Sequence, residues 1–474
     1  MVIDRRGKVQ RALHVDLIDS TRNRYAASEL FGSINTSDYK TTLATLGHQL
    51  IKQNLETLSL LNIEGHVEYN GRDIHLIFET SSTIGVVPLK SPISGKNEIS
   101  LIVKPRFDWE GIGVMMEEMG WKINPMILKL PLLPETERSI PNWVIATTIL
   151  FRIRLLLKSI DRKFGFIEEN LSAPKGSVNW LKYAQQNISR LNLLQIPCRY
   201  PTLDDDLALK GTIHFTLRKV LNSLESQKKS SIVVLQLIDV CKRLIELVQQ
   251  FQPLIPTKNY LSTFQRNSLR APSFKEGIEA IEWTIDNTGL AGLGDLRGLP
   301  WLMNMESLFE AWIESIFEKI AYQGGWKLRT GRKRETLTPI RWEHFNLGSQ
   351  KYLLPDVIIE RGTEVVIVDA KYKRHWEELS ITRWLKLDEE LRENHRDDFL
   401  QILAYSTLYE NKQIKCYLVY PCKMETYLSL LERGRLFNKG TIYAGSREIE
   451  ICLTAAPFGK QGQHILQNMI TSLS

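Results

Sequence analysis

The chain has 474 residues, of which 43% are hydrophobic and 24% charged, so it can bury substantial apolar cores. At roughly 100–200 residues per domain, this length predicts two to four domains. Lysine and arginine number 61 against 54 aspartates and glutamates, a formal net charge of +7. That charge is compatible with nucleic-acid binding, but many proteins that bind no nucleic acid share it.

Several other classes of protein are disfavoured. The five cysteines form no Cys-x-x-Cys pair, which indicates reduced thiols in a cytoplasmic protein and not a disulfide or zinc framework. Residues 1–30 are rich in Arg and Asp, and no run of 18 apolar residues occurs, so we expect neither a signal peptide nor contact with a membrane. A Gly-x-x-x-x-Gly-Lys-Ser/Thr motif is also absent, so a nucleotide-driven motor would have to be another chain.

Residues 1–122 predict a β-rich amino-terminal domain. The segment from Gly65 to Phe78 alternates apolar and polar residues around an Asn-Gly turn, which is typical of a hairpin. Further strands are expected at Ile84–Leu89 and Ile99–Val103. The Lys104-Pro105-Arg106 sequence that follows is open to two interpretations, a phosphate contact or a solvated loop, and we favour the loop.

Residues 123–300 predict a helical middle domain. Trp143–Ile160 and Leu235–Phe251 have the apolar spacing of amphipathic helices. Three consecutive aspartates at 204–206 are either helix-capping residues, favoured by the positive end of the helix dipole, or metal ligands; we favour capping. A glycine-rich stretch at 289–298 is expected to be a linker.

Residues 301–474 predict a mixed α/β core that opens with a helix at Met305–Tyr322, whose apolar face is flanked by Glu306 and Glu310. The densest basic cluster of the chain follows, KLRTGRKR. We expect Arg332, Lys333 and Arg334 in this cluster to contact DNA phosphates, with a merely solvated loop as the alternative.

The most informative stretch is LLPDVIIERGTEVVIVDAKYK, residues 353–373. Two β-branched runs flank a turn containing Gly362, which predicts a buried β-hairpin. Side chains alternate along a strand, so Asp369 and Lys371 are expected on one face. Carboxylates at Asp356 and Asp369 supply the hard oxygen ligands that Mg²⁺ or Mn²⁺ prefers, and Lys371 supplies a positive charge for a phosphorane transition state. The alternative is an ordinary surface hairpin with an Asp–Lys pair.

One further pair of residues supports the chemical interpretation. Phe399–Tyr409 has helical spacing, and Gln401 and Tyr405 lie one turn apart on the same face. The order Asp356, Asp369, Lys371, Gln401, Tyr405 resembles that of PD-(D/E)xK nucleases with a Gln-x-x-x-Tyr helix. The resemblance implies that a glutamate of the preceding helix joins the metal site; Glu310 is the first choice and Glu306 the alternative.

The chain as a whole resembles the McrC family, the nuclease subunit of McrBC-type modification-dependent restriction systems. The resemblance is carried by residues 85–87 and 99–107, Pro174-Lys175-Gly176, Cys198-Arg199-Tyr200, Asp204–Asp206, Asn304–Glu310 and the nuclease residues named above. It implies an α+β multidomain protein with a PD-(D/E)xK nuclease core that cuts DNA with Mg²⁺. It also implies an McrB-like AAA+ GTPase partner, which reads modified DNA and whose GTP hydrolysis this chain stimulates. The resemblance implies that the amino-terminal domain, residues 1–122, and the central segment contact this partner.

Two other functions remain open from the sequence. One is an autonomous restriction or repair nuclease that needs no motor. The other is a regulatory scaffold that activates an NTPase and retains only a vestigial nuclease site. The target sequence, the DNA modification and the stoichiometry do not follow from the residues.

Overall fold

The computed structural model describes residues 2–3, 9–10, 13–31, 39–70, 73–107, 109–131, 133, 141, 143–160, 163–204, 206–228, 231–266, 271–285, 298–343, 350–373, 389–409, 413–444, 447–458 and 462–473. The chain divides into two compact units: residues 1–141, 231–233 and 296–474 form the first, and residues 142–230 and 234–295 form the second. Within the described ranges, no helix is long and apolar enough to span a membrane.

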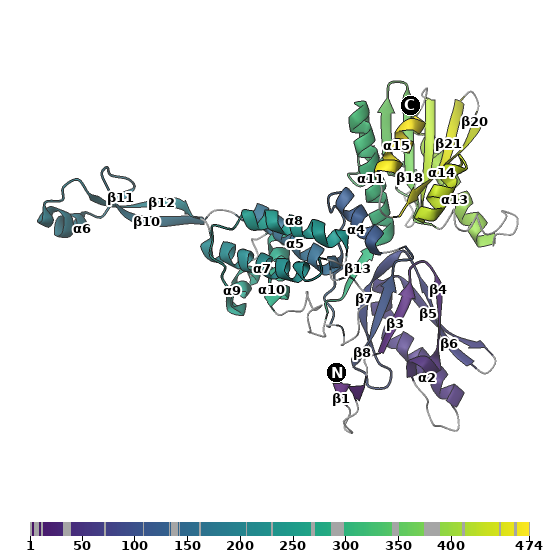
Figure 1. The fold of residues 1–474 in the computed structure, drawn as a ribbon, viewed down its shortest axis with the longest axis horizontal. Coiled ribbons are helices and arrows are strands. Elements are labelled where there is room, and N and C mark those ends of the chain that lie inside the picture. Colours follow the sequence, from purple (N-terminus) through teal and green to yellow (C-terminus); the bar gives the residue numbers. More distant parts are fainter. Residues whose placement is uncertain are drawn as a thin grey trace. The chain divides into compact units, whose positions relative to one another are not determined.

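The amino-terminal part of the first unit contains two main sheets (Figure 1), besides a short pairing of β1 (Val2–Ile3) with β2 (Val9–Gln10). The larger has the order β3 (Leu13–Ile18), β8 (Asn97–Lys104), β7 (Thr83–Lys90), β13 (Trp301–Asn304), β9 (Met126–Ile127). The smaller is antiparallel, with β4 (Arg22–Ala26), β6 (Asp73–Thr80) and β5 (Ile63–Asn70). Pairing of β5 with β6 confirms the expected hairpin, and α2 (Tyr39–Gln53) packs on both strands.

Strand β13 connects the amino-terminal sheet to the carboxyl-terminal part of the chain. It pairs with β7 so closely that a Cβ atom on Gly85 would lie 2.2 Å from the Trp301 carbonyl oxygen, which only glycine permits. Helix α11 (Met305–Gly324) begins at once, capped by the Asn304 side chain, which accepts from the Ser307 amide at 2.8 Å. The strand at the expected boundary, residue 301, therefore belongs to the amino-terminal sheet.

The carboxyl-terminal part of the first unit is built on a six-stranded mixed sheet. Its order is β14 (Lys327–Thr330), β17 (Val357–Arg361), β18 (Glu364–Ala370), β19 (Gln413–Cys422), β21 (Arg447–Pro457), β20 (Phe437–Ala444). The pairs β18–β19 and β19–β21 are parallel, as expected where helices cover the sheet. Helix α11 packs on β14, β17 and β18, and α13 (Glu389–Ser406) packs on β18 and β19.

The second unit combines a group of helices with a sheet of its own. The helices are α5 (Trp143–Ser159), α7 (Leu207–Glu225), α8 (Ile232–Glu246), α9 (Lys258–Arg266) and α10 (Pro272–Ile285). Helix α5 packs on α10, where the Arg152 guanidinium lies 3.1 Å from the Glu279 carboxylate. Most residues of the expected linker at 289–298 lie outside the described ranges.

A three-stranded antiparallel sheet corrects the expectation that the middle of the chain is helical. Strand β12 (Ile196–Asp204) pairs along its whole length with β10 (Lys163–Leu171), and β11 (Ser177–Val178) adds to its other side. We call residues 163–204 the arm. Its strands escaped the sequence analysis because they lack a continuous apolar face: Phe166 is 64% exposed and much of β10 is polar.

The aspartates at 204–206 divide between two elements. Asp204 ends β12, Asp205 lies outside the described residues, and Asp206 precedes α7. An Asp206 oxygen accepts a hydrogen bond from the Leu209 amide at 3.2 Å, which confirms the capping interpretation for this residue.

Substituting Asp206 with Ala removes this cap, and we expect it to lower the free energy of unfolding by about 1 kcal/mol. Asp206→Asn keeps an acceptor oxygen in place and should leave stability near that of the wild type. Chemical denaturation of both variants measures the difference. Equal stability of the Ala and Asn variants would contradict the capping role.

Candidate functional site

The expected hairpin forms and is buried. Strands β17 and β18 pair in antiparallel register from Val357 opposite Val368 to Arg361 opposite Glu364, and every residue of β18 is buried. Gly362 in the turn has φ +57°, a conformation that favours glycine. Because the apolar residues of both strands are buried, the residues at the strand ends also lie close to the protein core.

The two aspartates meet at the open end of this hairpin. Asp356 precedes β17 and Asp369 lies one residue before the end of β18, so the register brings them opposite each other. The Ala370 amide donates to Asp356 Oδ2 at 2.8 Å, which ties the start of one strand to the end of the other. Asp369 is only 1% exposed. Both carboxylates are thus held by backbone geometry and not by flexible loops.

Lys371 lies between Asp369 and helix α13. Its Nζ is 2.9 Å from Asp369 Oδ2 and donates to Gln401 Oε1 at 2.9 Å. The Gln401 Nε2 group donates in turn to the Tyr405 hydroxyl at 2.7 Å. The Lys371 amide donates to the Val419 carbonyl at 2.9 Å, which extends the pairing of β18 with β19 by one residue. The structure therefore brings Asp356, Asp369, Lys371, Gln401 and Tyr405 together.

Helix α11 contributes one glutamate to this cluster. Glu310 is partly buried, and burial followed by the charge of Glu306 raises its pKa, with a further contribution from Asp369. The charge of Lys371 opposes that rise. Glu306 is exposed in the first turn of the helix. Its partial burial and its electrostatic interaction with Lys371 and Asp369 make Glu310 a better candidate than Glu306 for the helix carboxylate of the site.

The cluster holds more negative charge than its surroundings balance. Burial, then the charges of Asp369 and Glu310, raise the pKa of Asp356 well above its usual range. Burial also raises the pKa of Asp369, although Lys371 opposes the shift. For Lys371, burial acts to lower the pKa, but the Asp369 and Asp356 charges outweigh it and the pKa rises. The raised pKa values of these carboxyls make the cluster a candidate site for a proton or a cation.

The donor set fits a hard divalent cation. Asp356, Asp369 and Glu310 offer only carboxylate oxygens, the ligands that Mg²⁺ and Mn²⁺ prefer. No group of three or more Asp, Glu, His or Cys side chains in the described part of the chain is arranged to enclose an ion by itself. Mg²⁺ usually binds through one or two protein carboxylates and completes its shell with water and substrate phosphate, so Asp356 and Asp369 could hold such an ion, with Glu310 as the third expected ligand.

Two residues that were not predicted from the sequence adjoin the site: Asp398 and Lys373. Asp398, 3% exposed, lies on α13 one turn before Gln401. It accepts from Lys373 Nζ at 2.7 Å and from the Tyr420 hydroxyl at 3.1 Å, and its charge acts on Asp369. The sequence did hold a signal for each residue. Asp398 lies three residues before Gln401 on the same helix, and Lys373 lies two residues after Lys371, so each is spaced to share a face with a site residue.

The basic cluster lies in the turn after β14 and is partly engaged with α11. The Arg332 guanidinium lies 3.5 Å from the carboxylate of Glu314, which is 3% exposed. Lys333 Nζ lies 3.4 Å from a Glu318 oxygen, and the Arg334 guanidinium lies 5.7 Å from the ring centroid of Tyr352. Arg332 therefore neutralises a buried carboxylate, whereas Lys333, in a partly exposed ion pair, is more accessible.

Comparison with known proteins gives the family. The model of the McrBC 5-methylcytosine restriction system component matches residues 122–421, more than half of the chain. The matched residues include Asp356, Asp369, Lys371, Gln401 and Tyr405. The class of protein is thus a restriction-system component, and the chain belongs to the McrBC family. This confirms the family resemblance expected from the sequence.

Solved structures give weaker similarities. One is a refined half-complex from the tetradecameric assembly of Thermococcus gammatolerans McrB AAA+ hexamers with bound McrC, with 13% identity and a TM-score of 0.42, covering 97% of this chain and 100% of that one. Another is the Thermococcus gammatolerans McrBC complex, with 14% identity and a TM-score of 0.26, covering 65% of this chain and 88% of that one. Scores this low establish no shared arrangement. No curated protein matches the sequence.

Removing one carboxylate should stabilise the metal-free protein. Asp356→Asn keeps an oxygen to accept from the Ala370 amide but relieves the repulsion, so we expect a higher thermal midpoint at pH 7. The gain should be a few degrees, at about 2–4 °C per kcal/mol in a domain of roughly 150–250 residues. Thermal unfolding in EDTA measures it, with Asp397→Asn, an exposed aspartate of α13, as the control.

The difference should depend on pH. A pKa raised in the folded state means that the folded wild type binds protons more readily than the unfolded chain, so its stability rises as the pH falls. The advantage of Asp356→Asn should therefore shrink from neutral pH down toward the ordinary aspartate pKa of about 3.9. A lower midpoint for the Asn variant at pH 7 would contradict the charge repulsion.

Proposed function

We propose that this chain is the Mg²⁺-dependent DNA endonuclease subunit of an McrBC-like restriction complex, with a PD-(D/E)xK active site at the open end of the β17–β18 hairpin. One observation carries the proposal: the Lys371 ammonium is held between the Asp369 carboxylate and the Gln401 side-chain amide, beside Asp356. A structural ion pair alone would not require three buried or partly buried carboxylates with raised pKa values around one lysine.

Each side chain has a distinct task in phosphodiester hydrolysis. Asp356, Asp369 and Glu310 would hold the metal, which when bound polarises the phosphate and lowers the pKa of water. Lys371 places a positive charge where negative charge develops on the phosphate oxygens. Its raised pKa keeps that ammonium protonated at neutral pH, so it acts as an electrostatic stabiliser and not as a base.

Gln401 and Tyr405 position the Lys371 ammonium. The Gln401 amide is oriented by its two contacts, because its nitrogen donates to Tyr405 and its oxygen must then face Lys371. Burial raises the pKa of Tyr405, so its hydroxyl stays neutral and can accept that bond. Gln401 is exposed, which also leaves it accessible to a DNA backbone.

Outside the active site, the turn at Arg332–Arg334, which we call the basic turn, would contact DNA. Lys333 is paired with Glu318 in a partly exposed bridge, and such pairs contribute little and exchange readily for phosphate. Arg334 lies beside Tyr352 and is the second phosphate ligand that we propose. Arg332 completes the expected set of three, but its pairing with Glu314 gives it a structural task as well.

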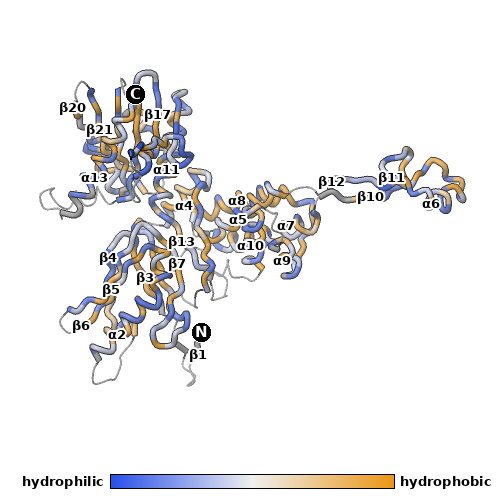
Figure 2. The backbone as a smooth tube through the Cα atoms, turned by 180° about the vertical axis from the view of Figure 1, so that it is seen from behind, coloured by the Kyte–Doolittle hydropathy of each residue, from blue (hydrophilic) through white to orange (hydrophobic). Residues whose placement is uncertain are grey.

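The partner that we propose is an McrB-like AAA+ GTPase. Membership of the McrBC family supports it. Exposed apolar side chains at the end of the arm support a protein contact in the central segment: Trp180 68%, Leu181 69%, Leu191 84% and Leu194 79% exposed. Figure 2 shows hydrophobic colouring in this region, next to α6 (Trp180–Lys182).

Lys371→Ala should separate the two activities of the complex. We expect cleavage of modified plasmid with Mg²⁺, GTP and the partner to fall by about 10²–10³-fold, as when other groups that stabilise a transition state are removed. Stimulation of GTP hydrolysis should stay at the wild-type level, because the arm is untouched. Lys415→Gln, which removes another ion-paired lysine of the same sheet, should cleave normally.

Other results would favour the alternatives. Wild-type cleavage at the same rate without partner or nucleotide would indicate an autonomous nuclease. Stimulation of GTP hydrolysis without any cleavage by the wild type would indicate a scaffold with a vestigial site. Robust cleavage in EDTA, or by Lys371→Ala, would exclude this hairpin as a metal-dependent active site.

The basic turn makes a separate prediction. The double variant Lys333→Gln, Arg334→Gln should bind DNA more weakly whatever its sequence, with a salt dependence reduced by about 0.9 in log–log slope for each phosphate that is no longer neutralised. Filter binding or anisotropy across a salt series measures the slope. Lys439→Gln removes an ion-paired lysine from β20 at the opposite edge of the sheet and serves as the control. An unchanged slope in the double variant would make the turn a solvated loop.

A further inference from the structure

Arg106, in the loop after β8, has a buried side chain, in contrast to the expectation of a solvated loop at residues 104–106. The side chain of Arg106 is 3% exposed, and that of its ion-pair partner Asp19 is 0% exposed. The Arg106 amide donates to Asp19 Oδ1, and the guanidinium Nε lies 3.8 Å from Asp19 Oδ2. The Arg106 Nη2 group donates to the Tyr372 carbonyl at 2.6 Å, and the guanidinium carbon lies 4.1 Å from the Tyr372 ring centroid.

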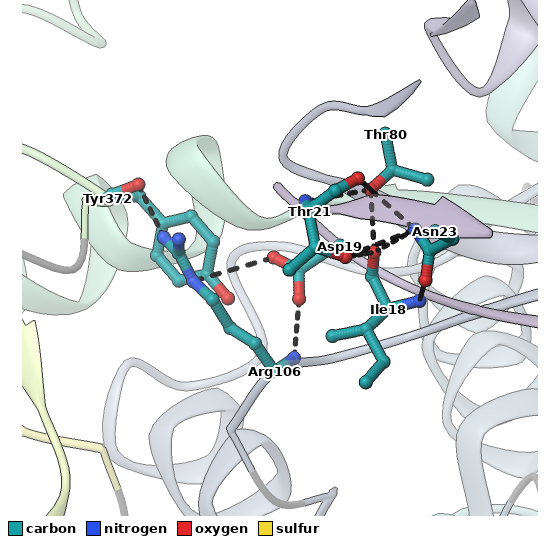
Figure 3. Close-up of polar contacts among 7 residues, drawn as sticks. All are labelled: Ile18, Asp19, Thr21, Asn23, Thr80, Arg106 and Tyr372. Atoms are coloured by element: carbon teal, nitrogen blue, oxygen red, sulfur yellow. Dashed lines mark hydrogen bonds and ion pairs between the residues drawn. The ribbon is translucent and has the colours of Figure 1, made fainter. Parts of the chain in front are cut away.

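Asp19 is itself rigidly placed. Its amide donates to the Lys104 carbonyl at 3.0 Å, at the end of the parallel pairing of β3 with β8. In the turn that carries it, the Ile18 amide donates to Asn23 at 3.0 Å and the Thr80 hydroxyl donates to the Ile18 carbonyl at 2.6 Å (Figure 3). The guanidinium is therefore anchored to the amino-terminal sheets and directed toward Tyr372.

Aromatic residues also connect this loop to the chain segments that carry Lys371 and Glu310. Phe107 stacks on Phe458 with ring centroids 4.5 Å apart and meets Tyr372 edge-on at 5.9 Å. Phe309 lies 6.3 Å from Tyr372 and 6.4 Å from Phe458. Tyr372 follows Lys371 in the chain, and Phe309 precedes Glu310. The loop thus supports the backbone next to two of the site residues.

A buried ion pair is an unfavourable way to close a loop, because both charges lose their hydration and one missing partner leaves the other uncompensated. Apolar residues would pack here without that desolvation penalty. What the guanidinium adds is direction, since its planar fork can contact a carboxylate, a carbonyl and a ring face at once. Burial and the Asp19 charge raise the pKa of Tyr372 well above its usual value, so its ring stays neutral beside the pair.

We propose that Arg106 and Asp19 are positioning residues for the cleavage reaction, which hold the Tyr372 main chain and thereby keep Lys371 in contact with both Asp369 and Gln401. The inference rests on the proposed nuclease function. The Lys371 amide is bonded to Val419 on one side, and the carbonyl of the next residue is bonded to Arg106 on the other. With the amide of Lys371 and the carbonyl of Tyr372 both held, the backbone that carries the lysine side chain is fixed on both sides of its Cα atom.

Replacement of Arg106 tests the proposal on the full chain in complex with its AAA+ partner. Arg106→Lys keeps a charge opposite Asp19 but lacks the fork, and Arg106→Gln removes the charge. We expect the single-turnover cleavage rate at saturating DNA to fall roughly 10- to 100-fold in both, as for small misplacements of a catalytic group. DNA affinity and GTPase stimulation should be unchanged. Amide hydrogen exchange of peptides covering residues 366–373 should become faster.

The matched control is Lys104→Gln. It breaks the 2.6 Å ion pair between Lys104 and Asp16, on the same two strands and two residues before Arg106. It should leave both the cleavage rate and the exchange of residues 366–373 as in the wild type. Lys371→Ala is measured beside it, because only that variant tests the active site itself.

The outcomes separate the two claims. If Lys371→Ala is inactive while both Arg106 variants cleave at the wild-type rate per folded molecule, the positioning role is wrong and the nuclease site stands. If Lys371→Ala cleaves normally, the proposed site is wrong. Should Arg106→Gln fail to fold, Arg106→Lys decides: a normal rate or unchanged exchange overturns the proposal, and a slow rate with a normal thermal midpoint supports it.

Discussion

Mutual repulsion among buried carboxylates is the constraint around which the carboxyl-terminal part of this protein is built. Asp356 and Asp369 are forced together by the register of an apolar hairpin, and Glu310 approaches from α11. One lysine and one backbone amide only partly offset that charge. A folded protein tolerates such an arrangement when a cation or a reaction requires it, since ordinary packing would favour apolar residues at these positions.

The surrounding structure keeps the repelling groups in place. The hairpin is central in a six-stranded sheet, so its strands are paired on both sides. Helix α11 is fixed at its start by strand β13, whose partners belong to the amino-terminal sheet, and further along by the Trp312 indole, which donates to Glu118 at 2.7 Å. Helix α13 supplies the residues that orient Lys371. Each support reaches the site from a different stretch of the chain, which makes its geometry cooperative.

The first unit is consequently more than the six-stranded sheet with an attachment. Its amino-terminal sheets contribute a strand that starts α11 and a loop whose arginine holds the backbone beside Lys371. The second unit has its own core and carries the arm, with exposed apolar residues at its end. This arrangement suits the division of tasks that we propose, in which partner contact and DNA cleavage use different surfaces of one chain.

Local pattern determined much of this protein from sequence alone: the hairpin at Val357–Val368, the extent of helices α5 and α11, the pairing of Gln401 with Tyr405 on one face, and the family. These features depend on residues close in the chain, where periodicity and turn chemistry act directly. The strands of the arm were not predicted, because polar strands with a solvated surface carry no periodic apolar signal. Only the tertiary structure decided that β13 joins the amino-terminal sheet, that Asp398 lies beside the site and that Arg106 is buried against Tyr372, 266 residues away. Such contacts depend on which distant segments pack together, and the Lys-Pro-Arg sequence is the same whether it faces solvent or a carbonyl.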